Sequence, residues 1–450
     1  MDYYIFVSLF AVLGVMYMII GFIASRNITT TQDYFLAGRK LGLWSLSLTL
    51  IATHLGGGVI IGTCDAAYVS GMYGIFYTLG IALGLLVLAC GFASKLRSFN
   101  VSTIAELLEK KYDSVFLRKI ASILSILSMG GILIGLVVSS RRFMIGCGID
   151  SDWILYIFWV FLIAYTVIGG LKAVVMTDSL QVAVIVAIFF GVFGYVVYEY
   201  SGSFSFPVET SFNMGISKFS GMIMVPILFS LVEQDLAQRF FAAKSRKVAF
   251  LSSIIAGSFL LIFSMIPVAF GILARNRGIE VPQGASVLMV MIRATTNNGV
   301  AAFVSCAVLA AIISTADSLL CAVSSNLAQD FSLGFLRRFS KLTISKWITL
   351  ILGIVVVIAG TFFDDVLEIY IQSYALLVCA MFVPVLFCFF MDELKKGAAL
   401  TAAFAGLVGF VVFKIHPIAV PREIASVLLS FVGYASYYVA SSVLKKVRRK

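Results

Sequence analysis

Long apolar stretches alternate with short polar segments along almost the whole chain. Each stretch is about 20 residues long, which is the length that an α-helix needs to cross the hydrocarbon core of a bilayer. The pattern predicts an all-α integral membrane protein that forms a single polytopic unit over residues 1-450, with about thirteen membrane-spanning helices. The expected spans are 3-23, 43-64, 73-94, 118-147, 152-170, 173-198, 219-238, 248-274, 299-323, 346-363, 366-391, 397-413 and 424-442.

Composition and charge placement agree with this pattern. Hydrophobic residues make up 61% of the chain and charged residues only 12%. The 33 lysines and arginines exceed the 22 acidic residues, and they concentrate in alternate polar segments around 26-40, 95-119, 239-247, 337-346 and 445-450. By the positive-inside rule, these segments are cytoplasmic, so the N-terminus is expected outside and the C-terminus inside the cell. The basic excess therefore reports membrane topology and gives no reason to expect a nucleic-acid partner.

The first apolar stretch and the cysteines need no special role. No basic residue precedes the first stretch and no small-residue cleavage site follows it, so we expect a retained span rather than a signal peptide. The seven cysteines lie in or beside apolar stretches without metal-ligand spacing, and we expect free thiols. They are Cys64, Cys90, Cys147, Cys306, Cys321, Cys379 and Cys388.

One apolar span, near 299-323, carries four polar residues in close succession: Ser314, Thr315, Asp317 and Ser318. A carboxylate at the centre of a bilayer costs about 2.5–3.5 kcal/mol on insertion scales, so this cluster is a candidate functional site. Helical spacing places Ala311 on one stripe with the three hydroxyl residues, with Asp317 at its edge. Oxygens on one stripe suit a hard cation. Alternatively, the hydroxyls serve only helix packing.

Two other spans contain helix-breaking residues. The sequence from Ala52 to Gly58 includes three consecutive glycines, and each costs about 1 kcal/mol relative to alanine in a helix. The second span should therefore unwind there, next to a cavity, although close glycine-mediated helix packing is the alternative. The span 219-238 contains Pro226, which should break it as well.

The positions of these two spans predict an internal repeat. Each is the first of five consecutive spans, in 43-198 and in 219-391, and broken helices at matching positions are typical of inverted-repeat transporters. We expect 3-23 to be a leading extra helix and 397-442 to form two peripheral C-terminal helices.

Asp178 adds a carboxylate inside the sixth span. It could share a cation with Asp317 and Ser318, or it could form an ion pair with a basic side chain near the cytoplasmic edge.

Three motifs resemble those of the sodium:solute symporter family: Gly169-Gly170-Leu171 with Thr177-Asp178 and Gln181, Gln238-Arg239 with Ala242-Ala243-Lys244-Ser245, and Ala310-Ala311 with Ser314-Thr315-Ala316-Asp317-Ser318. The resemblance runs from about Asp33 to the eleventh span. It implies a leucine-transporter-like fold with a leading extra helix. It also implies a sodium site made by carbonyls of the first broken helix and by oxygens of the ninth span. The matching residues here are Ala52, Leu55, Ala311, Ser314 and Thr315, and a possible second cation would be held by Asp178, Asp317 and Ser318.

The solute is less constrained by the resemblance. The run Leu55-Gly56-Gly57-Gly58 and the order Ser-Thr-Ala-Asp-Ser are most similar to the choline-transporter branch. Where that branch carries tryptophans, this chain has His54 and Glu233, so it lacks the aromatic cage expected for choline. The candidate solute-binding residues are Thr53, His54, Gly56, Glu233 and Gln234, and the candidate solutes are an amine, an amino acid or a similar small molecule. His54 could instead be a packed core histidine, and Tyr374 is a further candidate for the solute path.

The expected function is sodium-coupled symport of a small organic solute into the cell across the cytoplasmic membrane by alternating access. Sodium is the coupling ion, no organic cofactor is expected, and the lipid bilayer is the surrounding partner. A proton-coupled symporter using Asp178 or Asp317 is the nearest alternative. An intramembrane enzyme would need a nucleophile–base pair or a metal motif, and none is found, so the protein is not expected to be an enzyme. A transporter-like sensor would need an added signalling domain. The sequence predicts no particular oligomeric state.

Overall fold

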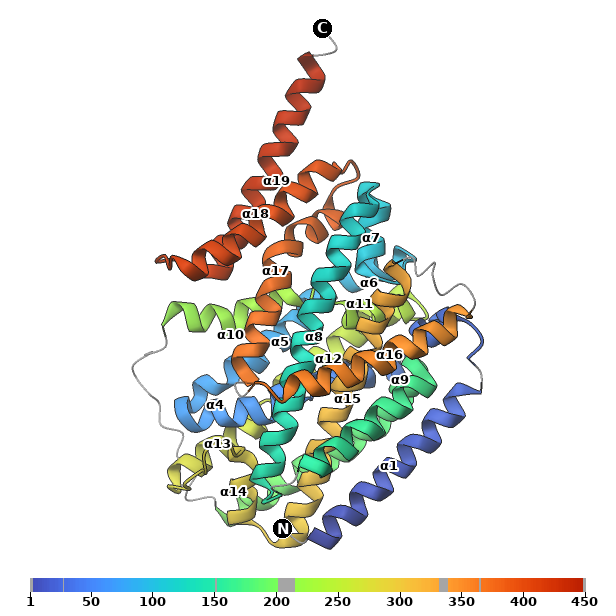
Figure 1. The fold of residues 1–450 in the computed structure, drawn as a ribbon. Helices are drawn as coiled ribbons and strands as arrows, with labels where there is room; N and C mark the ends of the chain where they lie inside the picture. Colours follow the sequence, from blue (N-terminus) through green and yellow to red (C-terminus); the bar gives the residue numbers. More distant parts are fainter. Residues whose placement is uncertain are drawn as a thin grey trace.

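The computed structural model describes residues 3–26, 28–149, 152–200, 215–331, 339–363 and 366–447. Basic residues of the expected cytoplasmic segments such as Arg337, Arg338 and Arg448 lie outside these ranges. The described chain is built from α-helices with a few short 3₁₀ and π segments, and it contains no β-strand. Within the described ranges, eleven helical stretches are long and apolar enough to cross a membrane. The helices pack side by side, with the two chain ends on opposite sides of the molecule (Figure 1).

In chain order, the α-helices are α1 (Tyr3–Ser25), α2 (Thr31–Leu36), α3 (Leu43–His54), α4 (Thr63–Ser70), α5 (Phe76–Val87), α6 (Ala93–Ser98), α7 (Ile104–Tyr112), α8 (Val115–Gly146), α9 (Asp152–Glu199), α10 (Ile216–Phe229), α11 (Gln234–Ala242), α12 (Arg246–Phe263), α13 (Met265–Asn276), α14 (Val287–Thr295), α15 (Asn298–Asp330), α16 (Lys341–Gly360), α17 (Val366–Phe390), α18 (Lys396–Ile415) and α19 (Arg422–Val447).

Two predicted spans, 152-170 and 173-198, are joined in the single element α9. A straight helix of its 48 residues would be about 72 Å long, more than twice the thickness of a bilayer core. The element bends at Gly170, whose φ of 52° is outside the helical region. A side chain could not fit there, because a Cβ on Gly170 would lie 2.5 Å from the carbonyl oxygen of Tyr34. The two apolar runs therefore correspond to two membrane crossings, and the chain turns between them at Gly170.

Tyr34 belongs to the short helix α2, which joins α1 to the core. Thr30 and Asp33 cap this helix reciprocally: the Asp33 amide donates to Thr30 Oγ1 at 3.1 Å and the Thr30 hydroxyl donates to Asp33 Oδ2 at 2.7 Å. The Thr30 hydroxyl bond holds the pKa of Asp33 below its usual value. The Tyr34 hydroxyl contacts the carbonyls of Thr166 and Val167 at 3.3 and 3.2 Å. The capped helix thus fixes Tyr34 against the bend in α9.

The first broken helix lies where the glycines predicted it. Helix α3 ends at His54, and the chain continues through a π-helical segment, Gly58–Gly62, into α4. The three glycines also allow close packing, because a Cβ on Gly56 would overlap the Thr315 side chain and one on Gly57 would lie 3.0 Å from Ser139 Cβ. The glycine run therefore shows both predicted features. The helix breaks there, and neighbouring helices pack closely against the break.

The second broken helix is also found. Helix α10 ends at Phe229 and α11 begins at Gln234, so the break follows Pro226, which lies in the last turn of α10. Glu233 precedes α11 with extended backbone angles, φ −71° and ψ 123°. The break exposes the first backbone groups of α11 in the protein interior, where only side chains or a ligand can satisfy them.

Helix α15 forms the centre of the bundle, whereas α1, α18 and α19 lie at its periphery. The most apolar window of α15 is 78% buried, compared with 22% for α1. Small residues fill the interior stripe of α15, which lets α3, α8, α9 and α11 pack against it. Helices α18 and α19 pack on each other and on α17, beyond the core (Figure 1). The serine and threonine cluster thus lies on one of the two most buried spans among the described residues, the other being α17.

Candidate functional site

Two hydroxyl groups of α15 contact backbone carbonyls at the end of α3. Ser314 Oγ lies 2.8 Å from the Ala52 carbonyl oxygen and 2.9 Å from that of Ala311. Thr315 Oγ1 lies 2.7 Å from the carbonyl oxygen of Thr53 and 3.3 Å from that of Ala311. Three carbonyl oxygens and two hydroxyl oxygens therefore gather where the first broken helix meets α15.

This set overlaps with the predicted sodium ligands. The structure brings together Ala52, Ala311, Ser314 and Thr315. Leu55 is buried beside them, but the contacts given for it are those of its amide, which donates to the carbonyls of Ile51 and Ala52 at 3.0 and 3.2 Å. Thr53, which the sequence analysis assigned to the solute, supplies the carbonyl that Thr315 contacts. Neutral carbonyl and hydroxyl oxygens beside an unwound helix are the donor set that transporters use for alkali cations.

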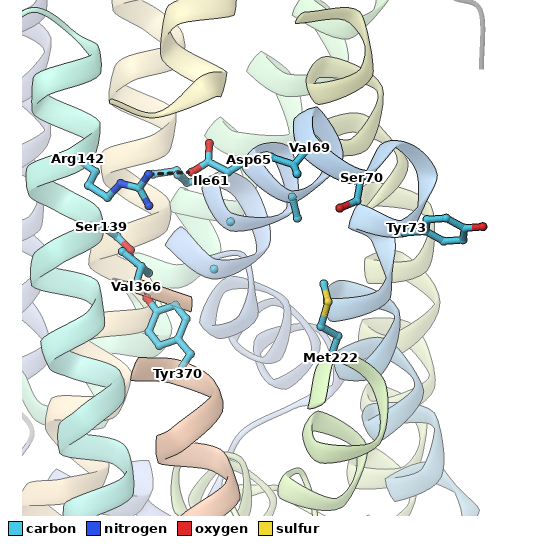
Figure 2. Close-up of a pocket in the computed structure, with 13 residues that line it drawn as sticks. Ile61, Asp65, Val69, Ser70, Tyr73, Ser139, Arg142, Met222, Val366 and Tyr370 are labelled. Carbon is cyan, nitrogen blue, oxygen red and sulfur yellow. Dashed lines mark hydrogen bonds and ion pairs between the residues drawn. The ribbon is translucent and has the colours of Figure 1, made fainter. Parts of the chain in front are cut away.

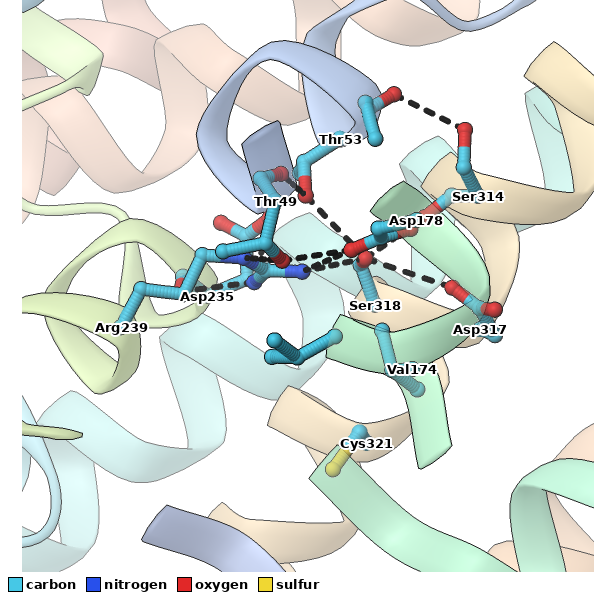
Figure 3. Close-up of polar contacts among 12 residues, drawn as sticks. Thr49, Thr53, Val174, Asp178, Asp235, Arg239, Ser314, Asp317, Ser318 and Cys321 are labelled. Atoms are coloured by element: carbon cyan, nitrogen blue, oxygen red, sulfur yellow. Dashed lines mark hydrogen bonds and ion pairs between the residues drawn. The ribbon is translucent and has the colours of Figure 1, made fainter. Parts of the chain in front are cut away.

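A fully buried arginine, Arg239 of α11, organises a second cluster next to this one (Figure 3). Its Nε donates to Thr49 Oγ1 at 3.0 Å, its Nη1 donates to the Asp235 carbonyl at 3.0 Å, and its Nη2 donates to Ser318 Oγ. The same Nη2 lies 3.8 Å from Asp178 Oδ2, to which Thr49 donates at 2.5 Å. Arg239 thus ties α11 to α3, α9 and α15.

Asp317 lies on the other side of Ser318. It accepts hydrogen bonds from the Tyr165 hydroxyl and, at 3.3 Å, from Ser318 Oγ. Ser318 Oγ also lies 2.6 Å from the Ser314 carbonyl and 3.2 Å from Thr53 Oγ1. A continuous chain of hydroxyl groups therefore links the carboxylates to the cluster of oxygens at the helix break.

The predicted second-cation residues, Asp178, Asp317 and Ser318, do lie close together, but Arg239 contacts two of them. The alternative offered for Asp178, an ion pair with a basic side chain, matches this contact. The sequence analysis did not single out Arg239 as a site residue. The sequence feature that could have identified it is an arginine four residues after Asp235, within a stretch long enough to cross the membrane.

The Arg239 cluster carries more acidic groups than basic ones. Asp178, Asp235 and Asp317 are all fully buried around the single guanidinium. Asp178 Oδ1 and Asp235 Oδ2 have no hydrogen-bond partner among the described residues. Unpaired charge in a low-dielectric interior is costly. These carboxyl groups must therefore be neutralised by protonation or by a further cation.

An inner cavity of about 30 Å³ lies beside the helix break, large enough for about two water molecules. Four of the residues predicted to bind the solute, Thr53, His54, Gly56 and Glu233, line this cavity. Gln234 does not: its Oε1 accepts from the Ile104 amide at 2.8 Å and its Nε2 donates to the Ser102 carbonyl at 3.3 Å. That side chain fastens α11 to the start of α7, so we remove Gln234 from the candidate solute site.

Asp235 and three tyrosines complete the lining of this cavity. Tyr77, Tyr370 and Tyr374 all face it, and the hydroxyls of Tyr77 and Tyr374 lie 2.9 Å apart. The rings of Tyr370 and Tyr374 are nearly parallel, with centroids 6.4 Å apart, and Phe229 packs on Tyr374 at 4.3 Å. Of these residues, the sequence analysis had named only Tyr374. The others lie on different spans, and only the fold brings them together.

A larger outer cavity of about 230 Å³ lies beside α4, between α8, α10 and α17 (Figure 2). Asp65 and Arg142 face each other across it, with Oδ2 and Nη2 3.8 Å apart. Tyr370 and Gly58 line both cavities. Tyr370 therefore stands at the boundary between the outer cavity and the site beside the helix break.

The chain is similar to known sodium-coupled transporters. A sequence model of the sodium:solute symporter family matches residues 34–406. The osmoregulated proline transporter OpuE of Bacillus subtilis is 25% identical over 343 residues, covering 71% of this chain and 70% of that one. Sodium/proline symporter 2 of Staphylococcus saprophyticus is 23% identical over 465 residues, covering 96% and 91%.

Two solved structures share the fold. A Na+-coupled sialic acid symporter in a substrate-bound outward-open state superposes with a TM-score of 0.82 at 16% identity, covering 95% of this chain and 96% of that one. A nucleobase-cation-symport-1 family transporter in a closed conformation gives a TM-score of 0.59 at 15% identity, covering 90% and 94%.

Fold and site together define a multi-pass membrane transporter with the leucine-transporter architecture. The chain belongs to the sodium:solute symporter family, because that family's sequence pattern extends over most of its length. The predicted family and fold class are therefore confirmed. The family and its matched members are transporters and not enzymes.

Proposed function

We propose that this protein is a sodium-coupled symporter that imports a small organic solute across the cytoplasmic membrane by alternating access. One observation carries the proposal: Ser314 and Thr315 of α15 meet the carbonyls of Ala52 and Thr53 at the break after α3. A cation at this junction would bridge two helices that must move relative to each other during transport.

The coupling ion is sodium, held by the carbonyls of Ala52, Thr53 and Ala311 and by the hydroxyls of Ser314 and Thr315, with Leu55 at the edge of the site. The ligands are neutral, so the ion keeps its charge and responds to the membrane potential. In the bound state both hydroxyls turn their protons away from the ion, which releases the carbonyls they now contact. Binding therefore exchanges helix-to-helix hydrogen bonds for a shared cation.

The polar end of the solute binds at the inner cavity between His54 of the first broken helix and Glu233 at the second, and the remainder extends into the adjoining outer cavity. The first repeat comprises 43-198 and the second comprises 219-391, and they insert with opposite orientations. With the N-terminus outside and the C-terminus in the cytoplasm, the outer cavity beside α4 faces the external medium. Sodium stabilises the outward-facing arrangement, and the two ligands together favour the transition that exposes both to the cytoplasm.

The driving force is sufficient for accumulation. One positive charge moving through 100 mV releases about 2.3 kcal/mol, and a tenfold sodium gradient adds about 1.4 kcal/mol. Their sum supports accumulation of the solute by a factor of about several hundred per sodium ion.

The experiment is uptake by proteoliposomes under an inward sodium gradient, with potassium replacing sodium in the control. Uptake that needs sodium and is weakened by Ser314→Ala supports the proposal. Ser324→Ala is the matched control, because Ser324 is also buried in α15 and its hydroxyl contacts only the carbonyl of Leu320, at 2.6 Å, in its own helix. Equal uptake in sodium-free buffer under a pH gradient would instead indicate proton coupling through Asp178 or Asp317.

A further inference from the structure

Two acidic side chains line the inner cavity at the start of α11, and the one guanidinium near them is shared with a further carboxylate. Glu233 precedes the helix but makes no capping hydrogen bond with its side chain, and it retains 7% exposure. Asp235 is fully buried; its Oδ1 accepts from the Leu236 amide at 2.8 Å, and its Oδ2 has no hydrogen-bond partner in the described part of the chain. Both residues line the cavity, two positions apart in the chain.

Arg239, on the same helix, is also bound to other groups. Its three nitrogens donate to Thr49, to the backbone carbonyl of Asp235 and to Ser318. Its Nη1 lies 3.9 Å from Asp235 Oδ2, beyond hydrogen-bonding distance, and it also serves Asp178. One guanidinium is therefore shared between Asp178 and Asp235, and Glu233 has no ion pair among the described residues.

Three tyrosines line the same cavity as these carboxylates. They are Tyr77, Tyr370 and Tyr374, and the mutual hydrogen bond of Tyr77 and Tyr374 holds their rings in place. The negative face of an aromatic ring attracts a cation, most strongly where water is excluded. A site with two carboxylates and three tyrosine rings favours a positive charge and repels a negative one.

From this arrangement we infer that the transported solute is a small organic cation, an amine or quaternary ammonium without a carboxylate, whose charged group lies between Glu233, Asp235 and the tyrosines. The inference rests on the proposed symport function and names its substrate class. Two of the matched relatives are named for proline, a solute with a carboxylate. The inner cavity of this chain would repel such a group.

Tyr370 and Gly58 connect the site to the outer cavity, so the remainder of the solute would extend towards Asp65 and Arg142. Those two side chains pair with each other at 3.8 Å, so they add no net charge to the approach. The charged group of the solute is therefore recognised at the inner cavity.

Matched ligands test the charge directly. Purified wild-type protein in sodium chloride is challenged with ethanolamine, ethylene glycol and glycine, which are respectively cationic, neutral and zwitterionic molecules of similar size. Choline and glycine betaine provide a second cation and a second zwitterion for the same comparison, each with a fully methylated nitrogen. We expect a saturable thermal shift and sodium-driven uptake into proteoliposomes only for ethanolamine or choline. Transport of glycine or betaine without transport of either cation would overturn the inference.

Variants then locate the site. Glu233→Gln and Asp235→Asn should each weaken the apparent affinity for the transported cation about tenfold or more, as expected for loss of a charged partner. The sodium concentration for half-maximal uptake should change much less. Glu423→Gln is the control, because Glu423 is buried at the periphery and paired with Arg422 at 2.7 Å. A larger effect on sodium than on the amine would overturn the inference by assigning the carboxylates to an ion.

The two proposals fail in different ways. If sodium, but not potassium, stabilises the wild-type protein and not Ser314→Ala, the symport proposal stands even when every amine fails. In that case only the substrate class is wrong. If the wild-type protein shows neither sodium-specific stabilisation nor sodium-driven uptake of any probe, the symport proposal itself is overturned.

Discussion

Ser314 Oγ lies 2.8 Å from the carbonyl oxygen of Ala52, and this contact joins the deeply buried helix α15 to the break after α3. The two residues are 262 positions apart in the chain. The hydroxyl oxygen and the carbonyl oxygen now share a proton in a hydrogen bond. The same two oxygens can instead bind one cation between them. The predictions below test this junction and the groups that support it.

Removing one hydroxyl should weaken sodium binding while leaving the fold intact. In Ser314→Ala we expect the sodium concentration for half-maximal uptake to rise about tenfold, since one ligand of several is lost. Thr315→Ser should retain more sodium affinity than Thr315→Ala, because it keeps the oxygen. Flux measured over a range of sodium concentrations provides the test, with Ser324→Ala as the control. Unchanged sodium dependence in Ser314→Ala would rule out this residue as a ligand.

A methyl group at Gly56 should disrupt the same junction by steric overlap. A Cβ at this position would collide with the Thr315 side chain, which cannot move without losing its contact with the Thr53 carbonyl. Gly56→Ala should therefore abolish sodium-dependent uptake or reduce it strongly. Gly130→Ala is the control, because nothing lies within 4 Å of a Cβ at Gly130. Normal transport by Gly56→Ala would contradict the close packing described for the break.

Arg239 should be needed for stability as well as for transport. Loss of one partner from a buried ionic cluster typically destabilises a protein by about 3–5 kcal/mol. Arg239→Met should therefore lower the melting temperature markedly. Arg239→Lys keeps the charge but cannot reproduce three donors in a fixed fork, so its melting temperature should lie between those of wild type and Arg239→Met. Thermal unfolding in detergent measures this, with exposed Lys247→Met as the control. Equal stability of all four proteins would contradict the central role of the arginine.

The ring of Tyr374 should matter more than its hydroxyl. Tyr374→Phe loses the 2.9 Å hydrogen bond to Tyr77 but keeps the aromatic face, whereas Tyr374→Ala loses both. We expect a modest loss of solute affinity for the phenylalanine variant and a several-fold larger loss for alanine. Competition against uptake of the transported amine measures both. Equal losses in the two variants would assign the effect to the hydroxyl.

The sequence predicted those parts of the fold that depend on local composition. Apolar runs located the spans, and the glycines after His54 and the proline at position 226 located both helix breaks. The polar residues at 314–318 indicated which stripe of α15 faces the protein interior, since polar groups in an apolar helix are costly where they face lipid. The spacing did not show that 152-170 and 173-198 would be joined at Gly170 as one bent element, because that depends on the approach of Tyr34.

The rest of the candidate site depends on contacts between distant segments. Gln234 and Asp235 are neighbours in the chain, yet one turns to α7 and the other to the cavity, and no single-sequence pattern distinguishes them. Arg239 reaches Thr49 across 190 residues. The tyrosines that line the inner cavity come from separate helices, so their common environment is visible only in the folded chain.

Binding of radiolabelled sodium to the purified protein tests the central claim most directly. The account predicts saturable binding that sodium chloride displaces and potassium chloride does not. It also predicts that binding is lost when Ser314 and Thr315 are both replaced by alanine and is retained in Ser324→Ala. Sodium binding that is unchanged in the double variant would contradict the claim that the junction of α3 and α15 holds the coupling ion.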